Sequence, residues 1–295
     1  MQLQRALALG FFDGVHPAHR RVLALARAQG DALGIPAAAV TFDRQPASFI
    51  HHTQEELICT LDERIRLLKE EARMDEVLVL PFDTDMMNTL PERFAADMLF
   101  DALGARYICA GFDYRFGKNG TGDAQMLQSL CKTRGIGCDI AGEYRLSGEK
   151  ISSSAIRAHI AHGDIQDAQK LLGRPFSFSG TVRHGKALGR TLGFPTMNIP
   201  LPAHIVRPAP GVYICRTRLR GNWHAAVCNI SEARLCEAYM LGHNEDAYGE
   251  AVTVELMEFI RPMRKFSSLE ELKTQVDFDK KTARSWFMIR YKSIF

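Results

Sequence analysis

Strands and helices alternate along the first half of this sequence, and this alternation limits the possible folds more than any other feature. The apolar run at residues 6–9 predicts a strand, and residues 10–14 form a turn bracketed by glycines. Val22, Leu23 and Ala26 then mark the apolar face of a helix, and residues 37–42 are a second apolar run. Because parallel strands need a crossover between them, this order is typical of a βαβ unit.

The same alternation continues to about residue 172. Sequence periodicity predicts these further elements: a helix at 61–71, a strand at 76–80, a helix at 91–103, a strand at 106–110, and helices at 153–162 and 165–172. We therefore expect a Rossmann-like parallel sheet with helices on both faces.

The sequence pattern changes after residues 173–175. Short β-rich runs at 211–218, 223–230 and 251–260 are separated by Gly and Pro, which predicts a small antiparallel barrel or sandwich. Residues 268–286 predict one amphipathic helix, broken near Asp277, that packs against the barrel. We expect an α/β domain over residues 1–175 and a β domain over residues 176–295.

The composition is ordinary for a globular chain, since 46% of the 295 residues are hydrophobic and 24% are charged. The net charge of +3 is too small to indicate a nucleic-acid partner. Residues 1–175 carry 20 basic against 23 acidic side chains and the remainder 17 against 11, so the halves differ by sign, at −3 and +6. The basic half could attract a polyphosphate ligand, and a solvated basic surface is an equal alternative.

The cysteines and the hydropathy of the sequence indicate the cellular compartment in which the protein is expected. The chain has seven cysteines, an odd number, with no C-x-x-C pair, and its first residues lack a signal-peptide pattern. No window approaches 18 uninterrupted apolar residues. We expect a reduced, cytoplasmic protein without a membrane span, and the sequence makes no prediction of its oligomeric state.

Residues 10–19, GFFDGVHPAH, connect the first strand to the first helix. Pro17 suits the first helical turn, and His16 and His19, three apart, lie on the same side of it. Free N–H groups and the positive end of the helix dipole favour an anion there. The alternative is two surface histidines near a helix start.

The longer pattern supports the anion site. The stretch resembles the HxGH signature of nucleotidyltransferases, and in particular the FAD synthetase module of prokaryotic bifunctional riboflavin kinase/FMN adenylyltransferases. Further matches are Thr41-Phe42, Asp62-Glu63-Arg64, Pro81-Phe82-Asp83, GFDYRFG at 111–117 and ISSSAIR at 151–157. The resemblance implies catalytic roles for His16, His19 and Arg157, an ATP phosphate site with Gly10, Phe12, Asp13, Gly14, Ser153 and Ser154, and a flavin or nucleotide pocket with Asp113, Arg115, Phe116 and Gly117.

Three positions depart from that family's pattern. Ala18 stands where HxGH has glycine, Ser154 stands where threonine is common, and TFDRQP at residues 41–46 lacks a proline and a histidine of the usual motif. An alternative hypothesis therefore stays open, in which the first domain has a degenerate transferase site.

The run GTVRHGKALGRTLGFPTMN at residues 180–198 is suited to phosphate and metal. Glycines let the backbone approach an anion closely, and Lys186 and Arg190 supply positive charge. Thr196 and Asn198 offer the neutral oxygens that suit Mg²⁺. A P-loop is excluded because Ala187 lacks the required hydroxyl, and the glycines and proline that follow would break its helix.

The run resembles the riboflavin kinase signature G-x-V…G-R-x-L-G-F-P-T-x-N. That resemblance implies a six-stranded antiparallel barrel with a closing helix. It further implies ATP held by Gly180, Gly185, Lys186, Gly189 and Arg190, Mg²⁺ held by Thr196 and Asn198, and a flavin or nucleotide pocket that includes Phe194 and Tyr248.

A kinase that acts on a primary alcohol needs a carboxylate beside the hydroxyl. Glu237 is the candidate, because CEAYMLGHNEDAYGE at residues 236–250 resembles the family stretch that begins with that glutamate. The alternative is a strand-end carboxylate without a catalytic role. The loop before Glu237 is short, and Met263 stands where glutamate is frequent.

The resulting expectation is a bifunctional enzyme with riboflavin, FMN and ATP as substrates and Mg²⁺ as cofactor. Two alternatives remain: a riboflavin kinase with a degenerate first domain, and a flavin-binding protein without catalysis.

Overall fold

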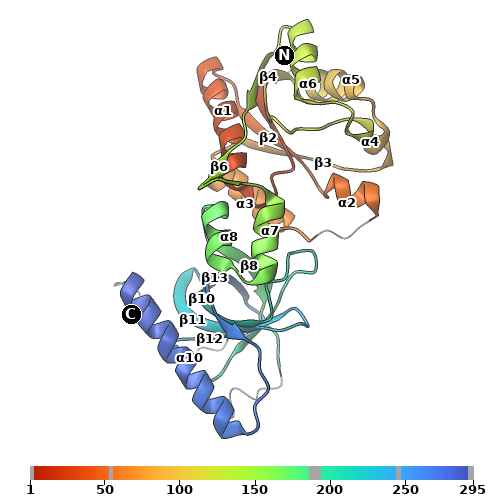
Figure 1. Cartoon of the computed structure of the whole chain (residues 1–295). Helices are drawn as coiled ribbons and strands as arrows, with labels where there is room; N and C mark the ends of the chain where they lie inside the picture. The colour runs from red at the N-terminus through yellow and green to blue at the C-terminus, as the bar shows by residue number, and fades with distance from the viewer. Residues whose placement is uncertain (1–2, 53–55, 186–193, 244–246, 292–295) are drawn as a thin grey trace. The chain divides into compact units, whose positions relative to one another are not determined.

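The structure is a computed structural model that describes residues 3–52, 56–185, 194–243 and 247–291 (Figure 1). The chain forms two compact units, Met1–Ser153 and Ser154–Phe295.

The first unit is built on a five-stranded sheet in the order β3-β2-β1-β4-β5. Every neighbouring pair is parallel, which confirms the predicted fold class. The strands are β1 (Arg5–Leu9), β2 (Ala37–Phe42), β3 (Glu76–Leu80), β4 (Ala105–Gly111) and β5 (Gly137–Ala141).

Helices cover both faces of this sheet, because successive side chains of a strand point to opposite sides. Leu7 and Leu9 of β1 belong to one buried cluster with η2 and α6, whereas Ala8 belongs to another with α1 and α3. The covering helices are α1 (Pro17–Leu33) and α3 (Leu61–Glu70) on one face, and α5 (Pro91–Arg93), the π-helix η2 (Phe94–Ala102) and α6 (Ala124–Thr133) on the other.

Shorter elements lie at the ends of the strands. They are the 3-10 turns η1 (Asp13–Val15) and η3 (Lys118–Gly120), the helices α2 (Pro46–His51) and α4 (Thr84–Asn88), and the hairpin of β6 (Arg145–Leu146) and β7 (Glu149–Lys150). The strand order reverses between β1 and β4, so the carboxyl ends of these two strands form a topological switch point, where sheets of this class bind ligands.

The second unit contains a six-stranded sheet in the order β8-β13-β10-β11-β12-β9, with every pair antiparallel. A bridge between Arg183 and Asn198 brings the two edges together, so the barrel is nearly closed, as predicted. Its strands are β8 (Phe176–Thr181), β9 (Met197–Pro200), β10 (Gly211–Leu219), β11 (Asn222–Ile230), β12 (Leu235–Met240) and β13 (Ala251–Pro262).

A single long helix, α10 (Leu269–Arg290), packs on the outer face of the barrel. Its Ala283 and Phe287 lie in one buried cluster with Val212 and Ile214 of β10. The predicted break near Asp277 is wrong, because the helix runs through that position. The buried Asp279, two residues further, is held by Arg261 at 2.7 Å, and no Gly or Pro interrupts the segment.

Two helices precede the barrel strands, α7 (Ser153–His162) and α8 (Ile165–Leu172). The sequence pattern predicted that both helices belong to the first half, whereas α8 contacts β8 and β13 of the second unit. The structural division therefore follows residue 153. The predicted domain boundary at residue 175 rests on the change in sequence pattern from alternating strands and helices to short β-rich runs. It stays a prediction.

Candidate active sites

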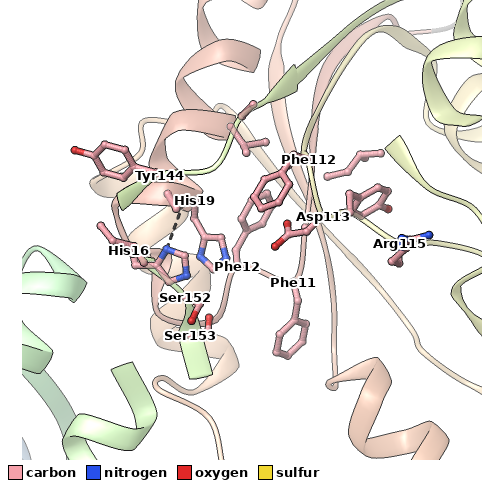
Figure 2. Close-up of a pocket in the computed structure, with 18 of the residues that line it drawn as sticks. Phe11, Phe12, His16, His19, Phe112, Asp113, Arg115, Tyr144, Ser152 and Ser153 are labelled. Atoms are coloured by element: carbon pink, nitrogen blue, oxygen red, sulfur yellow. Dashed lines mark hydrogen bonds between the residues drawn. The ribbon is translucent and has the colours of Figure 1, made fainter. Parts of the chain in front are cut away.

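The first unit has a cavity of about 390 Å³ at the switch point, between the ends of β1 and β4 (Figure 2). It is bounded by the turn after β1, the start of α1, the turn after β4 and the segment before α7. The lining residues are Leu9, Gly10, Phe11, Phe12, His16, Ala18, His19, Val22, Phe42, Pro46, Gly111, Phe112, Asp113, Tyr114, Arg115, Ala141, Gly142, Tyr144, Lys150, Ile151, Ser152 and Ser153.

The turn after β1 has an unusual backbone. Phe12, Gly14 and Val15 all have positive φ, at 58°, 77° and 44°. Non-glycine residues rarely adopt this region, so the surrounding contacts must hold the turn. Phe12 is buried against the sheet, and a Cβ on Gly10 would lie 2.8 Å from its ring.

Asp13 supplies one of these contacts. Its buried carboxylate accepts hydrogen bonds from the backbone N–H of Ile58, at 2.9 and 3.1 Å, and from that of Cys59 at 3.3 Å. The Asp13 carbonyl accepts a 3.0 Å bond from the Ser153 hydroxyl. The carboxylate thus faces the protein interior, which is consistent with a role in shaping the turn, and direct phosphate binding by Asp13 stays a prediction.

His16 and His19 come together at the start of α1, as their spacing predicted (Figure 2). The rings are stacked with centroids 3.5 Å apart, and His16 Nδ1 caps the helix by accepting from the His19 backbone N–H at 3.4 Å. Within the described residues, the buried Nδ1 of His19 has no hydrogen-bond partner. Burial, with the charges of His16 and Arg64, holds the pKa of His19 well below its ordinary value, so the imidazole is neutral at pH 7.

Arg64 is a buried residue beside this site. The sequence motif Asp62-Glu63-Arg64 matched the family, but it did not predict a role for Arg64. Its guanidinium donates to the carbonyls of Phe11 at 3.0 Å and Phe42 at 2.8 Å, and stacks 4.1 Å from the Phe11 ring. Thr41 donates to the same Phe11 carbonyl at 2.8 Å. Together these bonds fix the ends of β1 and β2. Burial lowers the pKa of Arg64, against the opposing charges of nearby acidic groups.

Ser153 lines the cavity and is the first residue of α7, and its predicted contact with ATP phosphate stays a prediction. Ser154 and Arg157 lie on the same helix, in the second unit, where the guanidinium donates to the Ser154 hydroxyl at 3.3 Å. Their roles toward ATP stay predictions.

A second cavity of about 460 Å³ adjoins the first and is mainly apolar. Four residues line both cavities: Phe42, Pro46, Tyr114 and Arg115. The other residues around the second cavity are Ala47, Ile50, His51, Phe82, Met86, Phe94, Phe116, Gly117, Asn119 and Gly120.

The turn after β4 joins the two cavities. Phe116 is buried and stacks on Tyr114, with centroids 5.7 Å apart. Gly117 has φ of 72°, and a Cβ there would lie 2.6 Å from Pro91, so this glycine is required for packing. Arg115 is largely exposed, 3.8 Å from Asp123, and Asp113 pairs with Lys150 at 3.3 Å.

The second unit has a row of polar side chains across three strands. Asn198 on β9, Glu237 on β12 and Asn229 on β11 are direct cross-strand partners, so their side chains lie on one face. Asn229 Nδ2 donates to Glu237 Oε2 at 3.1 Å. A Cβ on Gly185 would lie 2.4 Å from Asn198 Nδ2, so the loop that follows β8 passes directly over this amide.

The other residues predicted for this site differ in their surroundings, and three of them lie outside the described residues. Gly180 lets β8 approach β9, because a Cβ there would lie 2.7 Å from the Pro200 carbonyl. Phe194 is buried, and Tyr248 stacks on His184 with centroids 3.8 Å apart. Lys186, Gly189 and Arg190 lie outside the described residues.

Two family models match the chain: one described as FAD synthetase over residues 1–155, and one described as riboflavin kinase over residues 172–287. A curated relative from Haemophilus influenzae, described as a bifunctional riboflavin kinase/FMN adenylyltransferase, is 35% identical over 96% of this chain and 94% of its own length. This chain belongs to the bifunctional riboflavin kinase/FMN adenylyltransferase family.

Other members of this bifunctional family align equally fully. The Bacillus subtilis member is 32% identical over 97% of this chain and 93% of its own length, and the Escherichia coli K12 member 34% over 95% and 92%. A crystal structure described as a macrolide-efflux protein from Streptococcus pneumoniae has a TM-score of 0.87 at 30% identity, covering 97% of this chain and 95% of that one. No helix in the described part of this family member is long and apolar enough to cross a membrane.

The residues of the barrel fit the Mg²⁺ that a family using ATP implies. Asn198 is buried with its amide against Gly185, and Thr196 comes just before β9, so neutral oxygens are available. The described residues contain no cluster of three or more His, Cys, Asp or Glu side chains suited to a metal. Mg²⁺ needs no such cluster, because it binds through one or two protein oxygens together with substrate phosphates.

Proposed function

We propose that this chain makes FAD in two steps at two separate sites: the barrel phosphorylates riboflavin to FMN, and the switch-point cavity transfers AMP from ATP to FMN. One observation supports the proposal most directly: the chain has two different sites. The first is a cavity at a helix start with an adjoining aromatic cavity, and the second is the row of Asn198, Glu237 and Asn229 across three barrel strands.

In the first step, the terminal hydroxyl of riboflavin attacks the γ-phosphorus of ATP. A new O–P bond forms, the bond from the γ-phosphorus to the β-phosphate oxygen breaks, and ADP leaves. Glu237 accepts the hydroxyl proton, because a carboxylate at that position is a suitable base or orienting group. Its fixed place beside Asn198 and Asn229 supports this role.

Thr196 and Asn198 would hold Mg²⁺ at the barrel. When bound, the ion neutralises phosphate charge, which is the main requirement of phosphoryl transfer.

In the second step, a phosphate oxygen of FMN attacks the α-phosphorus of ATP and pyrophosphate leaves. No protein nucleophile is required, so the site contributes orientation and charge stabilisation. The start of α1 supplies N–H groups and its dipole, and neutral His19 can donate one hydrogen bond without adding charge. The hydroxyl of Ser153 is a further donor at the cavity wall.

The two adjoining cavities suit the two substrates of this step. The isoalloxazine ring matches the apolar cavity lined by Phe42, Phe82 and Phe94, because flat aromatic ligands pack against such side chains. The ATP phosphates match the cavity at the start of α1. Arg115, which lines both cavities, is then placed to pair with the FMN phosphate.

The experiment that tests the proposal is incubation of the purified chain with riboflavin and Mg·ATP, with riboflavin, FMN and FAD resolved over time by chromatography. FAD that accumulates after FMN supports both sites. FMN alone would leave the first unit without transferase activity, and unchanged riboflavin would point to binding without catalysis.

One observation favours the alternative of a degenerate transferase site. Ala18, which replaces the glycine of the family motif, lines the cavity. If its methyl group blocked the phosphates, the chain would make no FAD from supplied FMN, and Ala18→Gly would restore it. If the whole site were degenerate, Ala18→Gly would not. We favour a functional transferase site over a degenerate one. Ala18 lies in a helical turn, and its backbone has no positive φ that would require glycine.

All seven cysteines lie in the described part of the chain and none of them is in a disulfide, which suits a reducing compartment. We place the two reactions in the cytoplasm on this ground.

A further inference from the structure

Strand pairing sets Asn229 directly opposite Glu237. The two residues are cross-strand partners in the β11–β12 pair, and Asn229 Nδ2 lies 3.1 Å from Glu237 Oε2. Neighbouring pairs in the register are fixed by the same hairpin, so this contact is built into the sheet and does not depend on a loop. One carboxylate oxygen of Glu237, Oε2, is therefore held by the amide.

The chemistry of the pair also settles which way the amide points. An ionised carboxylate only accepts hydrogen bonds, so Asn229 must turn its NH₂ group toward Glu237. Its Oδ1 then points away, and this atom is buried without a hydrogen-bond partner among the described residues. A buried carbonyl oxygen without a donor is costly, which indicates that a donor arrives from a bound molecule.

We propose that Asn229 positions Glu237 for the phosphorylation step and that its Oδ1 accepts a hydrogen bond from a second hydroxyl of the substrate side chain. This inference rests on the proposed kinase function. The ribityl chain of riboflavin carries secondary hydroxyls next to the reacting primary one, so a base and an acceptor side by side match two neighbouring hydroxyls. Asn229 would then favour a polyol over a simple alcohol.

Two substitutions separate the two parts of the proposal. Asn229→Leu has a similar volume and removes both the donor and the acceptor. Asn229→Asp keeps an oxygen toward the substrate but replaces the donor to Glu237 with an acceptor. We expect kcat for FMN formation to fall on the order of 10- to 100-fold in both variants, because a misplaced base costs that much. We expect KM for riboflavin to rise only in Asn229→Leu.

A double substitution tests whether Asn229 acts through Glu237. In a Glu237→Gln background, Asn229→Leu should lower kcat less than twofold, since no carboxylate remains to be positioned. A merely structural role for Asn229 would lower kcat by the same factor in both backgrounds, and that result would overturn the positioning role.

A substrate analogue tests the second part. A flavin whose side chain carries only a terminal hydroxyl lacks the secondary hydroxyls. Wild-type protein and Asn229→Leu should have the same KM for this analogue, whereas they differ for riboflavin. An equal rise in KM for both substrates would overturn the hydrogen bond to a second hydroxyl.

Controls keep these outcomes separate from a failure of the proposed function. Asn222→Leu changes an exposed residue at the far end of the same strand and should leave both constants unchanged. Circular dichroism and chemical denaturation report whether the barrel of each variant is folded, and FAD formation from supplied FMN reports that the first unit is intact. If wild-type protein makes no FMN, or Glu237→Gln makes it at the wild-type rate, the proposed kinase role fails whatever the Asn229 variants show.

Discussion

Asp13 and Ile58 are joined across 45 positions of sequence by two hydrogen bonds, from the Ile58 N–H to both carboxylate oxygens of Asp13, at 2.9 and 3.1 Å. These bonds hold a turn in which Phe12 and Val15 have positive φ, and that turn leads directly into the helix start where His16 and His19 are stacked. The backbone of the first site thus depends on a buried carboxylate that faces away from the cavity.

Asp13→Asn should therefore slow FAD formation from FMN on the order of tenfold and leave FMN formation unchanged. Oδ1 accepts from both N–H groups, and Oδ2 accepts a second bond from the Ile58 N–H. In the amide, one of these two oxygens becomes an NH₂ donor that faces a buried N–H, so the free energy of unfolding of the first unit should fall by about 1–3 kcal/mol. Chemical denaturation and both activity assays measure this. Asp31→Asn, at an exposed position of α1, is the control; equal losses in both variants would contradict the prediction.

Glu237→Gln should lower FMN formation by a factor on the order of 10² to 10⁴, because the amide cannot accept the hydroxyl proton. FAD formation from supplied FMN should continue at the wild-type rate, since the second reaction uses another cavity. The two rates are measured separately by chromatography. Glu232→Gln, an exposed carboxylate just before β12, should have no effect. Loss of both activities in Glu237→Gln would contradict two separate sites.

Gly185→Ala should reduce FMN formation at least tenfold. The added Cβ would meet the Asn198 amide at 2.4 Å, with backbone on one side and a buried strand residue on the other, so the loop or the amide must move. Titration of the kinase activity with Mg²⁺ should show a weaker apparent affinity for the ion. An unchanged Mg²⁺ dependence would argue against Asn198 as a ligand.

Arg115→Gln should raise KM for FMN in the transferase reaction on the order of tenfold and change KM for ATP little, because the guanidinium lies at the junction of the two cavities. The kinase reaction should be unaffected. Arg93→Gln is the control, since Arg93 is a more exposed arginine of the same unit and pairs with Asp97. If ATP binding suffers as much as FMN binding, the assignment of the two cavities is incorrect.

His19 should make the first unit less stable in acid. Its pKa is lowered in the folded state, so below the ordinary value of 6.5 the unfolded chain binds a proton that the folded chain resists. The contribution of His19 is constant above pH 6.5, and stability falls as the pH drops below it, with a slope approaching about 1.4 kcal/mol per pH unit. Unfolding at pH 5 to 8 should show this slope in wild type and a smaller one in His19→Gln. His51→Gln, at an exposed position, should follow the wild type.

Much of the fold was predictable because its signals are local. The apolar runs at residues 37–42 and 76–80 are strands with the predicted bounds, and the helix at 153–162 is also as predicted. The break near Asp277 was not correct, because local polarity there is overridden by the pairing of Asp279 with Arg261 of a distant strand. The sequence also did not show that α8 belongs to the second unit, because that follows from the packing of its apolar face on β8 and β13.

The sites divide in the same way. The sequence by itself determined which residue types stand in each motif, including the two histidines of the first turn, the candidate base Glu237 and the oxygens of Thr196 and Asn198, because motifs are read along the chain. Only the tertiary structure decided that the Asp13 carboxylate binds backbone, that Arg64 holds the ends of two strands, and that Asn229 faces Glu237. These contacts join segments that strand pairing and burial bring together, and no local pattern specifies which polar atoms will meet there.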